Sequence, residues 1–358
     1  MKKTGVATLP LHHGKAPRWL FERMTALARS IVTAIVSEFG PSGFLRRVSD
    51  PFWFQSLGCV LAFDWHSSGL TTTVTGALKE AIRGLEKDLG LFIAGGKGLT
   101  ARKTPQQIEG IAERYPINPD PLIYASKLSA KVDNVAIQDG YQLYHHVMIF
   151  THKNDWAVIQ QGMNPSSKTA RRYHWLGEKV KDFVREPHEA ICCDRRGSVL
   201  NMVAIESEEA RRSVTEIAQM KPDALLKELS HIKRLDLTSR HNVTASDIDP
   251  KRFYSIMLKT YEKRPADFER LLGIEGIGPK TMRALSLISE LIYGIPPSYR
   301  DPARFSFAHG GKDGTPFPVD RRTYDRSIEI IKKAVMSARV GHKEKMGAIK
   351  RLSSFYRL

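Results

Sequence analysis

The chain has 358 residues and a formal net charge of +17, and 42% of its residues are hydrophobic. This length suits one large domain or two smaller ones, and the composition is that of a globular protein with a sizeable core. The chain shows no apolar stretch of membrane-spanning length. So large a positive charge therefore indicates a polyanionic partner, with nucleic acid as the leading candidate.

The three cysteines, Cys59, Cys192 and Cys193, are too few for a disulfide framework or a four-cysteine metal or iron–sulfur site within one chain. The N-terminal residues lack the apolar core of a signal peptide. We therefore expect a cytoplasmic protein with DNA as its partner and no membrane contact. The sequence indicates no cofactor and no resident metal.

Helical and strand patterns alternate in the first half of the chain. Apolar residues at helical spacing predict a helix over 17–39 that ends at Gly40-Pro41, and another over 73–89. A short apolar strand over 91–94 leads into Gly95-Gly96-Lys97-Gly98. This glycine-rich segment predicts a tight turn, with a contact of Lys97 to a DNA backbone as the alternative.

Aromatic and β-branched residues predict a β-hairpin over 141–151 and 156–159, and a further strand over 199–204 that we expect in the same sheet. Beyond residue 207 helical segments follow one another. The predicted fold class is therefore α+β. An N-terminal mixed α/β domain with a small sheet would span 1–205, and a mainly α-helical helix-hairpin-helix domain would span 206–358.

The segment Gly273-Ile-Glu-Gly-Ile-Gly-Pro-Lys-Thr281 carries the strongest functional signal. It lies between a short helix predicted over 265–272 and a longer one over 280–293, so its glycines form a tight turn that ends at a helix N-terminus. Backbone N–H groups there lack intrahelical partners, and the helix dipole favours anions. We therefore expect the turn to bind a DNA phosphate without reading a base.

Two parts of the C-terminal half together resemble a known signature. Lys280 follows the Gly276-Ile277-Gly278 turn, and Val319-Asp320-Arg321-Arg322 follows an irregular segment over 296–318. This arrangement resembles the helix-hairpin-helix DNA glycosylase superfamily of the endonuclease III type. The resemblance implies that Lys280 is the Schiff-base amine and Asp320 the essential carboxylate. The long segment and the two arginines depart from the family pattern, in which threonine and histidine often follow the aspartate.

Residues of the turn and basic residues near the two motifs are the candidates for contact with the DNA backbone. They are Gly276, Ile277, Gly278, Pro279, Thr281, Arg283, Arg321, Arg322 and Lys97.

Lys280 and Asp320 have the residue types that base excision needs. Cleavage of an N-glycosidic bond builds positive charge on the sugar, which a carboxylate stabilises, and an amine that attacks the anomeric carbon forms an imine that permits β-elimination. The predicted function is a DNA repair glycosylase with AP lyase activity that excises a modified base. The alternative is a non-enzymatic DNA-binding protein that uses the same turn.

A second alternative is a metal-dependent nuclease in the N-terminal half. Its candidate ligands are His12, His13, His66, His145, His146, His152, His174, Asp64 and Asp194. The spacing favours it poorly, because the adjacent His145 and His146 of a strand point to opposite faces. The aromatic residues Phe52-Trp53-Phe54 could stack on a base, but their apolar neighbours favour a place in the core.

The chain also resembles a family catalogued only as a domain of unknown function, number 763. The resemblance rests on the segment from Thr4 to Leu20, on Phe63-Asp-Trp-His-Ser-Ser-Gly69 and on Ala94-Gly-Gly-Lys-Gly98. It implies no activity, so the functional prediction depends on the turn at 273–281.

Overall fold

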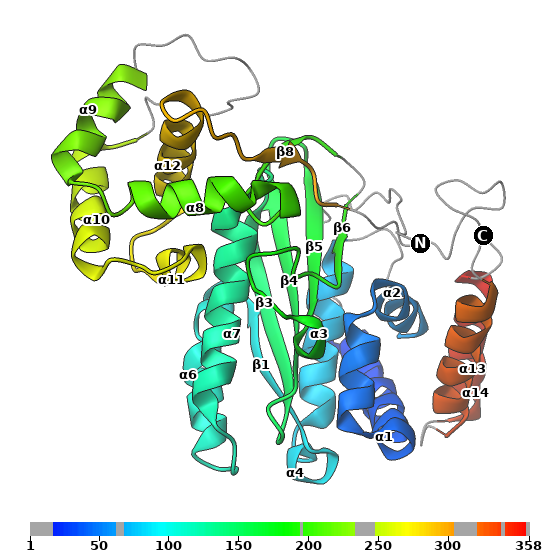
Figure 1. Cartoon of the computed structure of the whole chain (residues 1–358). Helices are drawn as coiled ribbons and strands as arrows, with labels where there is room; N and C mark the ends of the chain where they lie inside the picture. The colour runs from blue at the N-terminus through cyan, green and yellow to red at the C-terminus, as the bar shows by residue number, and fades with distance from the viewer. Residues whose placement is uncertain are drawn as a thin grey trace.

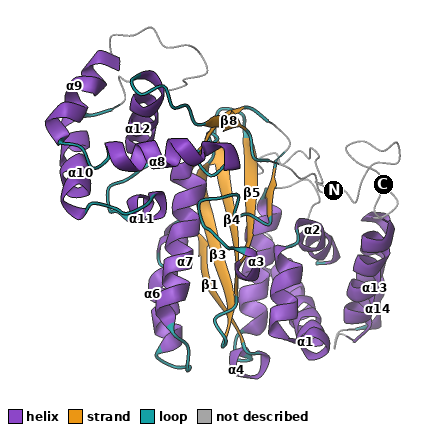
Figure 2. Ribbon diagram, viewed as in Figure 1, coloured by secondary structure: helices purple, strands orange, loops and turns teal. Residues whose placement is uncertain are grey.

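The computed structural model describes residues 17–61, 68–193, 196–232, 248–303, 321–337 and 341–355. The fold is mixed α/β: an antiparallel sheet lies between two layers of helices, and further helices gather near one end of it (Figures 1 and 2). None of the described helices is both long enough and apolar enough to span a bilayer.

The large sheet has five strands in the order β1-β3-β4-β5-β6, and every neighbouring pair is antiparallel. Its strands are β1 (Leu91–Lys97), β3 (Gln142–Thr151), β4 (Trp156–Asn164), β5 (Thr169–Leu176) and β6 (Ala190–Cys192). The predicted hairpin is confirmed as β3 and β4. Strand β5, which the sequence analysis did not predict, is buried along its whole length although it contains Arg171 and Arg172.

One face of this sheet is covered by α1 (Arg18–Ser49), α2 (Pro51–Val60) and α3 (Gly69–Ile82), with the short α4 (Glu86–Leu89) leading into β1. The prediction that the first helix ends at Gly40-Pro41 is confirmed, because Gly40 has φ of 70° and ψ of 170°, which lie outside the helical range. A second helical segment, which the sequence did not predict, follows this kink and continues to Ser49. The aromatic residues Phe52–Phe54 lie in the core, as their apolar neighbours indicated.

The opposite face is covered by α6 (Thr104–Ala112) and α7 (Pro119–Lys131), and α5 (Leu99–Arg102) connects β1 to α6. Helix α7 continues as one wider π-helical turn, η1 (Val132–Ala136). Short 3₁₀ turns follow at η2 (Gly177–Lys179) and η3 (Ile205–Ser207).

The helices near the end of the sheet are α8 (Glu208–Ile217), α9 (Pro222–Ile232), α10 (Pro250–Lys263), α11 (Phe268–Gly273) and α12 (Pro279–Leu291). A second antiparallel sheet of β2 (Ile137–Gln138), β7 (Ser198–Asn201) and β8 (Ser298–Arg300) ties this region to the rest. The expectation that the strand near 199 joins the large sheet is therefore wrong. It pairs instead with the strands that lead out of η1 and α12.

The last two helices, α13 (Arg321–Ser337) and α14 (His342–Phe355), pack against α1 and α2. One apolar cluster joins α13 and α14 to α1, α2 and α3. A second cluster runs from β1 and α7 through α8 to α12. Both cores thus combine residues from before and after position 205, and the division at 205 and 206 stays a prediction.

Candidate nucleic-acid interface

The turn between α11 and α12, residues Ile274–Gly278, is shaped by its glycines and anchored by isoleucines. Gly276 has φ of 94°, and a Cβ atom there would lie 3.1 Å from Cγ1 of Ile256. Ile277 is buried in the core and fixes the turn to it. The conformation therefore requires glycine at 276, because other residues adopt this backbone region at a cost.

Helix α12 begins at this turn, and its N-cap residue makes no side-chain cap hydrogen bond. Gly278 is its extended N-cap residue and Pro279 its first residue, a position where the missing N–H of proline costs nothing. The first bond along the helix runs from the Met282 N–H to the Gly278 carbonyl, over 3.0 Å. The N–H groups ahead of Met282 thus lie at the positive end of the helix, which can receive an anion.

Side chains from α7 and β2 bind backbone carbonyl groups of the turn and of the first residue of α12. Lys131, at the end of α7, donates from Nζ to the Ile277 carbonyl oxygen over 2.5 Å and to the Ile274 carbonyl oxygen over 3.4 Å. Burial lowers the pKa of Lys131. Gln138 donates from Nε2 to the Pro279 carbonyl oxygen over 2.9 Å, and its Oε1 accepts from Arg283 Nε over 2.7 Å. The turn is therefore held in place before any ligand arrives.

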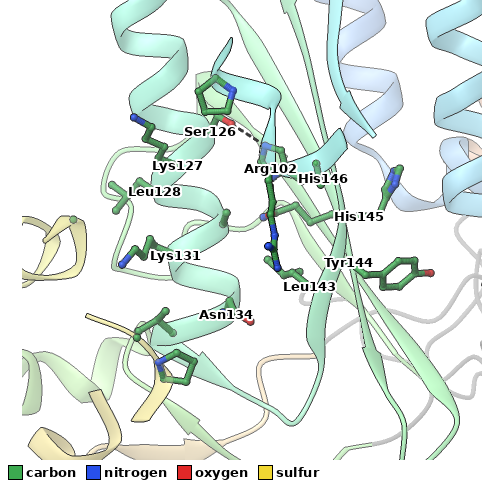
Figure 3. A pocket seen from close by; sticks show the side chains of 18 of the residues that line it. Arg102, Ser126, Lys127, Leu128, Lys131, Asn134, Leu143, Tyr144, His145 and His146 are labelled. Atoms are coloured by element: carbon green, nitrogen blue, oxygen red, sulfur yellow. Dashed lines mark hydrogen bonds between the residues drawn. The ribbon is translucent and has the colours of Figure 1, made fainter. Parts of the chain in front are cut away.

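A cavity of about 580 Å³ opens between the turn, α5, α7 and β3 (Figure 3). The turn contributes Ile277, Gly278 and Pro279 to its wall. Its charged lining residues are Arg102, Lys127 and Lys131, and no aspartate or glutamate is among the described residues that line it. Because three cationic residues and no carboxylate are among the described residues that line it, the cavity favours an anionic ligand.

Lys97 lies at the end of β1, beside the cavity. Its Nζ is 5.8 Å from the centre of the Tyr144 ring. The predicted tight turn at Gly95–Gly98 is wrong for most of its length, because β1 continues through Lys97 and only Gly98, with φ of 61°, turns the chain into α5. Gly95 allows a close approach, since a Cβ atom there would lie 2.2 Å from the His146 carbonyl oxygen.

The adjacent histidines of β3 contact opposite layers, as the strand pattern predicted. His145 Nε2 lies 3.0 Å from Thr75 Oγ1 on α3, whereas His146 Nε2 lies 2.8 Å from Ser126 Oγ on α7. Burial lowers the pKa of His145 to about 3 and also lowers the pKa of His146. Both imidazoles are therefore neutral near neutral pH, and the charge of the cavity comes from its lysines and arginine.

The structure brings together the predicted residues at 276–283. Lys280 is exposed at the second position of α12, Thr281 is buried behind it, and Arg283 lies on the next turn. Lys280 itself does not line the cavity.

The remaining predicted residues are placed elsewhere or not described. Asp320 lies outside the described residues. Arg321 and Arg322 begin α13, which packs against α1 and α14, whereas α12 packs against α8 and α9 (Figure 1). The helix that carries these arginines therefore does not pack with the turn.

The described ranges contain no group of three or more histidine, cysteine, aspartate or glutamate side chains arranged to hold a metal ion. Several predicted ligands of the nuclease alternative, namely His12, His13, Asp64, His66 and Asp194, lie outside those ranges. His145 and His146 face different layers and cannot bind one ion together.

Lys131 and Gln138 were missed by sequence reasoning. Each is an ordinary polar residue at a helix end or in a short strand. Their partners lie more than a hundred positions away in the chain. No local pattern marks such residues.

The fold and this site define a mixed α/β protein with a basic cavity beside a glycine turn that opens a helix. The chain belongs to the family described as protein of unknown function (DUF763), which matches residues 5–319. No curated protein and no solved structure matches the chain.

Proposed function

We propose that this protein binds duplex DNA, and that the α11–α12 turn contacts the sugar–phosphate backbone. The observation that carries the proposal is the N-terminus of α12, where the N-cap residue Gly278 makes no side-chain cap hydrogen bond, beside a cavity with three cationic lining residues and no lining carboxylate among the described residues. Backbone N–H groups and a helix dipole bind phosphate independently of base sequence, so the contact would be structure-directed rather than sequence-specific.

The fixed geometry of the turn supports this proposal. Lys131 and Gln138 already hold carbonyl groups of Ile277 and Pro279, so the backbone at the start of α12 is fixed in place. A site that is ordered before binding loses little conformational entropy on binding. The exposed Lys280 adds a positive charge at the same helix end.

Base excision is the second proposal, and the cavity is the observation that favours it. A volume of about 580 Å³ lies in the range of small-molecule sites, and it adjoins the turn that would hold the backbone. A nucleotide extruded from the duplex would enter it at the cost of unstacking. In this proposal Lys280, which is next to the lining residue Pro279 but is not itself a lining residue, supplies the amine of a DNA glycosylase with AP lyase activity, and Asp320 supplies the carboxylate.

DNA binding is tested by fluorescence anisotropy of a labelled duplex over a series of salt concentrations. Lys280→Ala should weaken binding and lower the slope of log affinity against log salt by about one, the value for one lost phosphate contact. The matched control is Lys87→Ala, because Lys87 is an exposed lysine on α4, at the far end of the sheet from α12. Equal slopes for both variants and the wild type would contradict the placement of the phosphate contact.

Excision is tested with duplexes that carry uracil, oxidised guanine, hydroxylated pyrimidines or an abasic site, in chelator with borohydride. The proposal expects a covalent adduct that is lost in Lys280→Ala. Strand cleavage that requires metal and survives this substitution would favour the nuclease alternative. Binding without an adduct on any of these duplexes would leave the protein a non-enzymatic DNA-binding protein.

A further inference from the structure

Four side chains form a continuous hydrogen-bonded series at the wall of the cavity. Ser126 Oγ lies 2.8 Å from His146 Nε2, and His146 Nδ1 lies 2.8 Å from Gln160 Oε1. Gln160 Nε2 in turn lies 2.5 Å from Asp133 Oδ2. Ser126, His146 and Gln160 all line the cavity, and Figure 3 shows the bond of Ser126 toward β3. Helix α7, η1, β3 and β4 thus each contribute one member.

The proton positions in this series follow from Asp133. Its carboxylate is buried and accepts from Trp175 Nε1 over 2.9 Å, a group that can only donate, and it contacts His188 Nε2 at 2.5 Å. The Gln160 amide must therefore direct its NH₂ group to Asp133 and its carbonyl oxygen to His146. That oxygen can only accept, so the proton of His146 is on Nδ1.

With its proton on Nδ1, His146 presents a lone pair on Nε2, and the Ser126 hydroxyl must donate to it. This is the relation between the nucleophile and the general base in serine-dependent group transfer, with the base oriented by a third group on its other nitrogen. Burial lowers the pKa of His146, so the ring is neutral and able to take a proton at neutral pH. The structure thus holds an alcohol, a base and an orienting amide in sequence.

From this geometry we propose that Ser126 is a nucleophile toward phosphorus, with His146 as its general base and Gln160 and Asp133 as positioning residues. The choice of a nucleic-acid phosphodiester as substrate rests on the proposed DNA binding. It is favoured by Arg102 and Lys127, which line the same cavity and would offset the charge of the phosphoryl oxygens.

The step is balanced within the protein and the substrate. Ser126 Oγ attacks phosphorus, the new Oγ–P bond forms, and the ester bond from phosphorus to the leaving oxygen breaks. His146 Nε2 takes the serine proton and returns it to the leaving oxygen. The products are a strand joined to Ser126 through a phosphodiester and a strand end with a free hydroxyl, which can attack in reverse.

The test uses the full-length wild-type chain and a fluorophosphonate probe, whose phosphorus loses fluoride when an activated serine attacks it. Peptide mass spectrometry should find the phosphonate on Ser126. His146→Gln should slow this labelling by roughly a hundredfold or more, the usual effect of removing a general base. Ser230→Ala is the control, because Ser230 is an exposed serine on α9 outside the cavity lining and should leave the labelling rate unchanged.

Gln160→Met separates positioning from a merely structural role. Without the amide oxygen, which raises the pKa of His146, the acid limb of the labelling rate should move to lower pH. Absence of label on Ser126 in a wild-type chain that unfolds cooperatively would overturn the proposal, and so would label that persists at full rate in His146→Gln. DNA binding measured on the same samples tests the proposed function separately, since the probe contains no nucleic acid.

Discussion

Two groups of cations in this protein contrast sharply, those of β5 and those of the cavity. Arg171 in β5 is 1% exposed and pairs with Asp139 over 2.9 Å and with Asp301 over 2.8 Å. Arg102 and Lys127 face a cavity that has no lining carboxylate among the described residues. The same positive charge thus serves the core in one region and an open site in the other.

Arg172 extends the contrast. It is fully buried, and its Nε lies 2.8 Å from His174 Nε2 while its Nη2 donates to Gln55 Oε1 over 3.2 Å. Burial lowers the pKa of Arg172 to about 10, which still leaves it charged at neutral pH. A pair of adjacent arginines in the sequence is therefore no indication of a DNA-binding surface here.

The largest effect should come from breaking the β5 group. Arg171→Met leaves Asp139 and Asp301 buried without their cation, which should cost about 3–5 kcal/mol of unfolding free energy. The measurement is unfolding by urea. Arg300→Met is the control, because its pair with Glu206 is exposed and should contribute at most about 1 kcal/mol. Equal losses of unfolding free energy in the two variants would show that the buried Arg171 pairs contribute no more to stability than an exposed pair.

The second largest loss of unfolding free energy should come from a substitution that strains the α11–α12 turn. Gly276→Ala places a Cβ atom at a positive φ and against Ile256, which should cost about 1–3 kcal/mol and weaken DNA binding. Gly273→Ala is the matched control, since no atom lies within 4 Å of a Cβ built there. We expect it to change unfolding by no more than about 0.5 kcal/mol. Normal DNA binding by a folded Gly276→Ala protein would contradict the role of the turn.

The buried His145 of β3 should make the free energy of unfolding depend on pH. In the unfolded chain His145 takes a proton near its usual pKa of 6.5, whereas in the folded chain burial lowers its pKa to about 3. Stability is therefore complete above pH 6.5 and is lost as pH falls toward 3, by up to about 1.4 kcal/mol per pH unit. His145→Asn should flatten this dependence in urea unfolding between about pH 7 and 4. An unchanged slope would show that His145 is protonated in the fold.

The smallest change in unfolding free energy should come from substitution of a cationic residue that lines the cavity. Lys127→Ala should alter the unfolding free energy by no more than about 0.5 kcal/mol, because no buried carboxylate depends on it among the described lining residues. It should nevertheless weaken DNA binding and reduce its salt dependence. Stability loss comparable to that of Arg171→Met would place Lys127 in the structural group instead.

Local patterns predicted the elements whose determinants are local. The β3–β4 hairpin, the strand at 91 and the two helices around the turn follow from periodicity and from glycine and proline positions. Strand β5 could not be predicted from periodicity, because Arg171 and Arg172 appear as surface charges until their partners are known. Asp139 and Asp301 lie 32 and 130 positions from Arg171.

The candidate site also contains some residues that a local sequence pattern marks and others that it does not. Gly276, Gly278 and Pro279 could be found because a glycine turn before a proline at a helix start is a local signal. The cavity could not, since its wall combines α5, α7, β3 and the turn. The series that begins with Ser126 depends on contacts among four elements and on hydrogen-bond directions that only a fold defines.

Amide hydrogen exchange of the wild-type protein with and without duplex DNA is the sharpest test of DNA binding at the α11–α12 turn. We expect slower exchange on binding in peptides that cover the start of α12 and in those that cover α5 and the end of α7. Exchange in β5 should not change. Protection confined to α13 and α14, with the start of α12 unchanged in a saturated complex, would show that DNA binds elsewhere than at the turn.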